Sequence, residues 1–302
     1  MLFLRKPKPG PERAMEWFKA NMVEGKGIIV NSRQRVPYPE VTGYFVPTLY
    51  RWGEPGLARA CTRWLTSIQL PDGAFPAPDG VPYTFDTAQV MRGLSAAHLQ
   101  GEPVAQSLAR AADWMLTQVG PDGRLGTPST ELWGDIASDL IHTYAIHPLA
   151  QAGELLGRPE YVEAGRFVLS YYRKQDGLVP FNRLSHFHAY AMEALVELGE
   201  TELARRGMGE VERLQRKDGS IPAYPGVDWI CSTGIAQYAG VWYRLGKREP
   251  ADRALAYLER IQNKSGGFFG SYGAGATYMP GAEIGWAVKY FLDAHHLKAS
   301  HA

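Results

Sequence analysis

The amino-acid sequence predicts an all-α fold: a closed toroid of six helical hairpins, (α/α)6, that spans residues 1–302 as a single domain. Three observations lead to this prediction. A helix that ends in Gln and is followed by a Gly-containing turn recurs along the chain, a second glycine ends the helix that comes next, and the helices alternate between two kinds of surface. Regular self-similarity of this kind is typical of stacked or closed repeat architectures.

The first observation is the repeated turn. In the segment 64–73, an amphipathic helix ends in Gln69 and leads into a polar turn with Gly73. Equivalent pairs are Gln118 and Gly123, Gln175 and Gly177, Gln215 and Gly219, and Gln262 and Gly266, and residues 15–27 form a degenerate first copy. The copies indicate six units of similar structure.

The second observation is a glycine after each apolar helix. Gly53, Gly101 and Gly157 are each followed two residues later by Pro, and Gly199 and Gly246 precede charged residues. A left-handed Gly commonly ends a helix, and Pro is favoured in the first turn of the next one. Each unit is therefore expected to contain a helix, a long loop, a second helix and a short turn.

The two helices of a unit differ in their surfaces. The first helices combine an apolar stripe with charged residues, as expected for one solvent-facing side, whereas the second helices are more apolar and richer in Gly and Ala. The first helices, near 11–22, 55–69, 103–118, 159–174, 201–215 and 250–262, should form an outer ring. The second helices, near 40–52, 86–100, 135–156, 186–198, 229–245 and 281–294, should form an inner ring.

The last hairpin favours a closed ring over an open solenoid. An open array needs terminal repeats with polar outer faces. The final predicted helix instead carries the apolar residues Ile284, Trp286, Val288 and Phe291. These side chains need a partner, which closure against the first hairpin would supply.

Composition and charge argue against several classes of protein. The net charge of +1 gives no bulk electrostatic basis for binding nucleic acid or an anionic membrane. No apolar stretch is long enough to span a bilayer, and the N-terminal apolar run is too short for a signal peptide. Cys61 and Cys231 show neither metal-ligand spacing nor a disulfide framework. We therefore expect a cytoplasmic protein that uses no metal or cofactor.

The functional end of the toroid is expected where the inner helices begin, because the long loops meet there and the helices point their positive ends to that face. Polar and aromatic residues gather at these helix starts in every unit. The candidates for catalysis are Asp86, Asp135, Asp139, His142, His186 and Glu283, and the candidates for substrate binding are Tyr38, Glu40, Tyr44, Trp133, Arg183, His188, Asp228, Trp229 and Tyr278.

Carboxyl groups beside aromatic rings are typical of a sugar site, since rings stack on sugar faces while acids bond hydroxyls and transfer protons. Simpler explanations exist for some of these acids. Asp86, Asp135 and Asp228 stand where helix N-caps are expected, and the helix dipole alone favours Glu40 and Glu283 in first turns. Both interpretations stay open for these five residues.

The strongest single cluster contains Asp135, Asp139 and His142. Spacings of four and three place them on one helical face, and capping does not account for Asp139. Two carboxylates one turn apart repel each other, which should raise the pKa of one of them and suit an acid–base role.

A histidine pair lies in the next unit. His186 and His188 are two residues apart and cannot share a helical face, so we expect one to reach the site and the other to pack. A zinc site is not expected from this spacing. Arg183 precedes the pair and is either a ligand for a substrate carboxylate or only a loop charge.

These features resemble the six-hairpin α/α-toroid superfamily across nearly the whole chain. Its members include glycoside hydrolases such as unsaturated glucuronyl hydrolases, many polysaccharide lyases and sugar epimerases. The segment 85–94, Phe-Asp-Thr-Ala-Gln-Val-Met-Arg-Gly-Leu, looks like the Asp-Thr-Gly-Gln-Val…Gly-Leu stretch of the sugar-acting members. The resemblance implies a carbohydrate-active enzyme.

The Gln…Asp-Gly turns also resemble the repeats of terpene cyclases and protein prenyltransferases. Class II cyclases use an Asp-x-Asp-Asp-Thr-Ala motif, of which the segment 83–88 keeps Asp86 alone among the acids. Prenyltransferases bind zinc with an Asp-x-Cys spacing, whereas Asp228 and Cys231 are three residues apart. These departures argue against isoprenoid and zinc chemistry.

The sequence thus predicts an enzyme that acts on an acidic or neutral oligosaccharide or glycan intermediate by metal-free acid–base catalysis. Hydrolysis, β-elimination and epimerisation use the same residue types and stay open. One alternative is an isoprenoid cyclase-like enzyme with Asp86 as proton donor. Another is a toroid that binds glycans without turnover.

Overall fold

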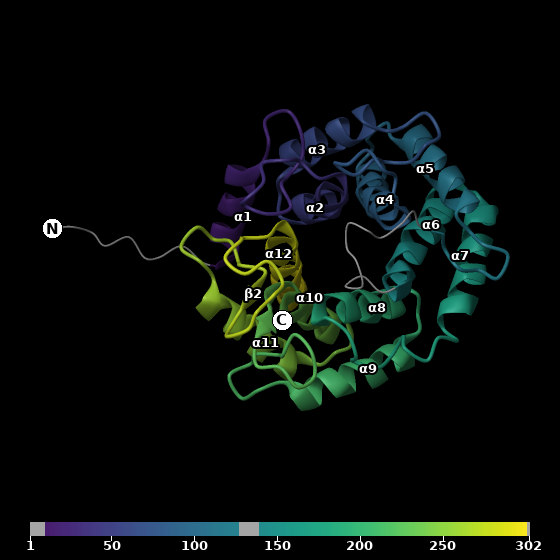
Figure 1. The fold of residues 1–302 in the computed structure, drawn as a ribbon. Helices are drawn as coiled ribbons and strands as arrows, with labels where there is room; N and C mark the ends of the chain where they lie inside the picture. Colours follow the sequence, from purple (N-terminus) through teal and green to yellow (C-terminus); the bar gives the residue numbers. More distant parts are fainter. Residues whose placement is uncertain (1–9, 127–138, 301–302) are drawn as a thin grey trace.

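Two concentric rings of helices make up residues 10–126 and 139–300, the part of the chain that the computed structural model describes (Figure 1). The outer ring contains α1 (Gly10–Asn21), α3 (Pro55–Ser67), α5 (Ala105–Thr117), α7 (Pro159–Tyr172), α9 (Thr201–Leu214) and α11 (Arg248–Ile261). The inner ring contains α2 (Pro39–Arg51), α4 (Thr84–Leu99), α6 (Thr143–Leu156), α8 (Ser185–Glu197), α10 (Ser232–Arg244) and α12 (Gly285–Ser300). The predicted alternation of outer and inner helices is confirmed.

The inner ring is closed. Each inner helix contacts the next one along the chain, and α12 contacts both α2 and α1, so the last hairpin packs against the first. Trp286, Val288 and Phe291 of α12 are buried in this closure. The prediction of a closed toroid over an open solenoid is confirmed.

The repeated Gln and Gly residues hold neighbouring outer helices together. Gln262 Nε2 donates to the carbonyl oxygens of Gly266 and Gly10, at 2.9 Å each, and thereby ties the last outer helix to the first. Gly266 has φ +93°, and a Cβ there would overlap the carbonyl of Arg13 in α1. Gln69 and Gln215 make the same pair of bonds to their own turns and to the next outer helix.

Small residues let the inner helices crowd together, as predicted. A Cβ at Gly43 of α2 would lie 2.5 Å from the carbonyl oxygen of Gln89 in α4. The backbones of these two helices therefore approach too closely for any larger residue at this position. This crossing sets the spacing of the two helix starts that carry Glu40 and Asp86.

Three inner helices begin later than predicted. α6 starts at Thr143 rather than near 135 and is preceded by a 3₁₀ turn, η2 (Asp139–His142). α10 starts at Ser232 rather than near 229, because β1 (Ile230–Cys231) pairs in antiparallel fashion with β2 (Ser271–Tyr272) and its backbone groups bond there. α12 starts at Gly285 rather than near 281, because Glu283 and Ile284 form bridges to Phe269 and Asn31.

A membrane span requires a helix that is both long and apolar. None of the helices within residues 10–126 and 139–300 meets both conditions.

Candidate functional site

Two buried carboxyl groups lie at the starts of neighbouring inner helices. Glu40 is in the first turn of α2 and Asp86 is in the first turn of α4. The Tyr38 hydroxyl donates a 2.9 Å hydrogen bond to Asp86 Oδ2, and Trp286 Nε1 in α12 contacts both oxygens of Glu40 at 2.9 and 3.1 Å. Three inner helices therefore place these side chains together at one end of the ring.

The capping explanation for Asp86 is wrong. Tyr83 occupies the N-cap position of α4, and its side chain makes no capping hydrogen bond. Asp86 lies within the helix and accepts a bond from Tyr38, a residue that precedes α2. Its carboxyl group therefore points toward the neighbouring inner helix, so capping does not explain its presence.

Burial disfavours the ionised form of both carboxyl groups and so raises their pKa values. Desolvation raises the pKa of Asp86 to about 7, against a smaller opposing effect of the hydrogen bond from Tyr38. Desolvation, followed by the charge of Asp86, raises the pKa of Glu40 well above its usual value. Because both take these hydrogen bonds from neutral groups, a phenol and an indole, no bonded cation offsets the cost of ionisation.

Aromatic side chains surround the axis below the two acids. Tyr44 donates to the Tyr190 hydroxyl at 3.0 Å, and the rings of Phe85 and Tyr144 lie 5.1 and 5.0 Å from that of Tyr190. Tyr290 bonds Tyr144 at 3.3 Å and completes a layer of four tyrosines from α2, α6, α8 and α12. Below, we call Tyr44, Tyr144, Tyr190 and Tyr290 the tyrosine layer.

The two histidines have different surroundings. The ring of His186 faces the aromatic cluster, with its centroid 4.5 Å from that of Tyr190, and His186 Nδ1 lies 2.6 Å from the Gln237 amide oxygen. His188 is held by Tyr238 at 2.8 Å and by the Val179 carbonyl at 2.9 Å. Burial lowers the pKa of each imidazole to about 3, so both are neutral at pH 7. Within the described residues, the hydrogen bond of His186 uses Nδ1 alone, whereas both ring nitrogens of His188 are bonded and it is a packing residue.

Asp139 has an environment opposite to that of Asp86. It begins η2, which contacts α4, α6 and α8, and is half-buried. His142 Nδ1 and Arg124 Nε each lie 3.2 Å from a carboxyl oxygen of Asp139. Although burial opposes it, these partners lower the pKa of Asp139. The prediction that Asp139 lies within the inner helix is wrong, since it begins η2 before α6. Asp139 is not the member of the Asp135 and Asp139 pair with a raised pKa, and Asp135 lies outside the described residues.

Several predicted residues make other contacts. Arg183 donates to the carbonyls of Gly177 and Leu178, at 2.7 Å each, and so fixes its own loop. Asp228 is fully exposed and pairs with Arg216 at 3.4 Å, and it precedes the start of α10 by four residues rather than capping it. The structure therefore does not bring Arg183 and Asp228 together with Asp86.

Glu283 lies between outer and inner helices. Trp17 Nε1 of α1 donates to it at 2.6 Å, Asn263 donates at 2.8 Å, and the Ser265 hydroxyl also bonds it. Glu283 thus fastens the loop before α12 to the outer ring. It lies outside the first turn of α12, so the helix dipole does not explain it.

Trp229 and Tyr278 are both buried. Trp229 packs edge-on against Tyr224 at 5.7 Å, and Tyr278 lies 6.0 Å from the ring of His186. Tyr278 therefore belongs to the aromatic cluster, while Trp229 packs in the loop before α10. Trp133 and Asp135 lie outside the described residues.

Sequence reasoning missed three residues of this cluster. Trp286 holds Glu40, Gln237 orients His186, and Tyr190 lies at the centre of the tyrosine layer. Trp286 is the second residue of its helix, just as Glu40 is of α2, so aligning the first turns of the inner helices would have found it. Gln237 and Tyr190 lie deeper in their helices, where no local pattern distinguishes them from core residues.

Metal chemistry has no candidate among the residues described. Within 10–126 and 139–300, no three His, Cys, Asp or Glu side chains are grouped so that they could hold an ion. The two acids at the helix starts bond a phenol and an indole instead.

Comparisons with known proteins agree on the fold. No protein-family model and no curated protein matches the sequence. An unsaturated glucuronyl hydrolase specific for heparin superposes with a TM-score of 0.75 at 14% identity, covering 96% of each chain. An alpha-amylase from Clostridium perfringens superposes with a TM-score of 0.72 at 13% identity, covering 97% of this chain and 99% of that one. A glycosidase in complex with glucose gives 0.74 at 12% identity, covering 96% and 97%.

These similarities define the class of fold. The chain has the α/α-toroid architecture of these glycosidase structures along nearly its whole length. The predicted resemblance to the six-hairpin toroids is therefore confirmed at the level of the fold.

Proposed function

We propose that this protein is a glycoside hydrolase-type enzyme that acts on a small neutral oligosaccharide, with Asp86 as general acid and Asp139 as general base. The observation that carries the proposal is the opposite tuning of the two carboxyl groups. Burial raises the pKa of Asp86 to about 7, whereas His142 and Arg124 lower the pKa of Asp139. Glycosidases need one protonated and one ionised carboxyl group at the same pH.

The surroundings of Asp86 suit a sugar ring. Tyr38, Tyr278 and Trp286 are aromatic side chains at the same end of the inner ring. Such rings stack on the apolar faces of sugars while their polar atoms bond hydroxyl groups. Glu40, kept protonated, can donate a hydrogen bond to a sugar oxygen.

Hydrolysis is better supported than elimination or epimerisation of a uronate. Those reactions abstract the proton beside a carboxylate, whose charge needs a cationic partner. Arg183, the candidate for that partner, donates through both terminal nitrogens to the carbonyls of Gly177 and Leu178, although its Nε has no partner among the described residues. His186 is neutral at pH 7 because burial lowers its pKa to about 3. A neutral substrate has no carboxylate and therefore needs no cationic partner.

The test begins with a ligand panel and ends with turnover. Thermal unfolding is followed with neutral oligosaccharides, unsaturated uronate disaccharides and isoprenoid diphosphates, because a ligand of the native state raises the midpoint. Hydrolysis of the sugars that bind is then measured for wild type, Asp86→Asn and Asp139→Asn. We expect each variant to lose a factor of about 10² to 10⁴ in kcat, the usual contribution of acid–base catalysis.

Asp228→Asn is the matched control, since it makes the same chemical change on a fully exposed residue. It should keep wild-type turnover. Wild-type activity should fall as the pH rises through about 7, where Asp86 loses its proton. Undiminished hydrolysis by Asp86→Asn would overturn the proposal, and sugar binding without any turnover would favour a glycan-binding toroid.

The tyrosine layer favours one second candidate, an isoprenoid cyclase-like enzyme. Aromatic faces stabilise cations, and a protonated Asp86 could start a cyclisation. The same panel separates the two candidates. Stabilisation by isoprenoid diphosphates and by no sugar would support cyclase chemistry.

A further inference from the structure

A cavity of about 400 Å³ lies at the opposite end of the inner ring from Asp86. The tyrosine layer separates the two ends, and Tyr44 and Tyr144 belong to the cavity wall. All six inner helices contribute to the lining. The polar lining includes Arg51, Arg92, His147, Glu193, Arg244 and Lys289, one from each inner helix.

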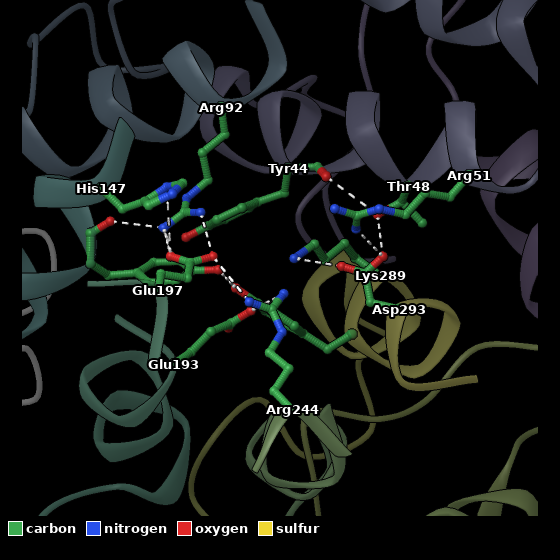
Figure 2. A network of polar contacts seen from close by, with 12 residues as sticks. Tyr44, Thr48, Arg51, Arg92, His147, Glu193, Glu197, Arg244, Lys289 and Asp293 are labelled. Carbon is green, nitrogen blue, oxygen red and sulfur yellow. Dashed lines mark hydrogen bonds and ion pairs between the residues drawn. The ribbon is translucent and has the colours of Figure 1, made fainter. Parts of the chain in front are cut away.

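The lining is strongly charged for the centre of a helical ring. Figure 2 shows side chains from different helices directed toward one region, with Arg92, Arg244 and Lys289 around it. Among the described residues, the wall holds four cations, Arg51 included, and three carboxylates, those of Glu193, Glu197 and Asp293. Burying so many charges costs more free energy than apolar packing would, so fold stability alone gives no reason for them.

Some of the charged side chains in the cavity wall are fully paired. Arg92 makes a bidentate contact with Glu197 at 2.7 and 2.9 Å, and Lys289 Nζ lies 3.0 Å from Asp293. Thr48 donates to the other oxygen of Asp293 at 2.7 Å. These contacts form a rigid frame across α2, α4, α8 and α12.

Other groups in the wall are left with weak or missing partners. Arg51 is 41% exposed and reaches Asp293 at 3.3 Å, and Arg244 reaches Glu197 and Glu193 only at 3.4 and 3.5 Å. Glu193 is 9% exposed at its side chain, and its Oε2 has no hydrogen-bond partner among the described residues. A buried carboxylate oxygen without a donor is costly unless a ligand supplies one.

We propose that this cavity binds a small hydroxylated anion, a sugar acid or a sugar phosphate. Arg51 and Arg244 would hold the carboxylate or phosphate with charge-assisted hydrogen bonds, and Glu193 Oε2 would accept a bond from a hydroxyl group. The surplus of one positive charge in the wall matches an anionic ligand. A volume of about 400 Å³ lies within the range of small-molecule sites. The proposal does not depend on the function proposed for Asp86.

The experiment is calorimetric titration of the full chain at pH 7 with glucuronate, glucose 6-phosphate and glucose. We expect at least one of the two anions to bind more than tenfold more tightly than glucose, since the third ligand lacks the charge. Arg51→Gln should weaken anion binding about tenfold or more, because it removes one charge-assisted contact from a half-exposed position where the fold tolerates the change.

Lys247→Gln is the matched control, because it removes one positive charge at a surface pair with Glu212. Anion affinity should stay at the wild-type value in this variant and in Asp86→Asn. Binding of glucuronate alone or of the phosphate alone would identify which anionic group is recognised. Equal affinities for glucose and both anions, or equal losses in Arg51→Gln and Lys247→Gln, would overturn the proposal. Loss of anion binding in Asp86→Asn would place the anion at the other end and likewise overturn it.

Discussion

The pKa values of buried carboxyl groups shift in opposite directions at the two ends of the inner ring. At one end, burial raises the pKa of Asp86 to about 7 and that of Glu40 well above its usual value. At the other end, neighbouring cations lower the pKa of Glu197 and of Asp293 to about 2, although burial opposes this shift in both. Glu40, Asp86 and Asp293 are buried and the side chain of Glu197 is only 9% exposed, so the depth of burial does not distinguish them.

The bonded partners make the difference. Arg92 and Lys289 contact Glu197 and Asp293 directly, whereas Asp86 and Glu40 receive hydrogen bonds from Tyr38 and Trp286. A neutral donor stabilises an anion less than a cation does, and in a buried site it does not offset desolvation. One end thus has acids that hold protons and suit catalysis, and the other has a fixed ionic frame.

A large loss of stability is expected from a single change at the end that carries Glu197 and Asp293, which we call the ionic end. Glu197→Gln leaves the Arg92 cation, whose side chain is only 11% exposed, without its bidentate partner, so the free energy of unfolding at pH 7 should fall by about 3 kcal/mol. Glu40→Gln replaces a protonated carboxyl with an uncharged amide of similar shape and should change it by less than about 1 kcal/mol. Urea unfolding followed by circular dichroism measures both.

Glu202→Gln provides the reference for this comparison, since Glu202 is exposed on α9. Its effect should stay within about 0.5 kcal/mol. Equal losses for Glu197→Gln and Glu40→Gln would show that the two ends do not differ in the way proposed.

The next effect is a pH dependence of opposite sign at the two ends. In the folded state Asp86 keeps its proton up to about pH 7, whereas an aspartic acid in an unfolded chain has a pKa of 3.8. The stability linked to this proton is complete below about pH 4 and is lost as the pH rises toward 7. Asp86→Asn should therefore match the wild type at pH 4 and exceed it at pH 8, by roughly 4 kcal/mol at most.

At the ionic end the linkage runs the other way. The pKa of Glu197 is lowered to about 2, so its contribution is complete above its unfolded value and is lost as the pH falls from about 4 to 2. Urea unfolding of wild type, Asp86→Asn and Glu197→Gln from pH 2.5 to pH 8 tests both signs. A wild type and Asp86→Asn with parallel stability curves from pH 4 to pH 8 would contradict the raised pKa.

The smallest expected effect is a shift in the pKa of Asp86. Tyr38→Phe removes the hydroxyl that donates to Asp86 Oδ2, a bond that lowers the pKa of this carboxyl. The alkaline limb of the kcat/KM profile should move to higher pH by less than about one unit. Tyr83→Phe is the control, because the Tyr83 hydroxyl donates to Asp79 at 2.9 Å. A limb that moves to lower pH would contradict the assignment of Asp86 as the titrating acid.

Much of the fold could be predicted because its determinants are local and repeated. The Gln–Gly pairs recur along the chain, and Gln69, Gln215 and Gln262 use the same two bonds to join consecutive outer helices. The starts of α6, α10 and α12 were misplaced, because strand pairs, bridges and a 3₁₀ turn precede these helices. Such contacts join residues that are distant in the sequence.

The candidate site could be predicted only in part, for a related reason. Position at the start of an inner helix identified Tyr38, Glu40, Asp86 and His186, which the structure brings to one end of the ring. The same criterion also selected Glu283, which bonds Trp17 of the outer ring instead. A loop residue can turn either inward or outward, and only its distant partners decide which.

The sequence by itself determined the number of hairpins, their alternation in two rings and the end at which acids and aromatic residues gather, since periodicity and helix starts are properties of neighbouring residues. Only the tertiary structure decided which carboxyl groups hold protons and which are paired. Asp86 and Tyr38 are 48 positions apart, and Arg92 and Glu197 are 105 apart. Charge interactions depend on distance in space and on burial, and closure of the ring sets both.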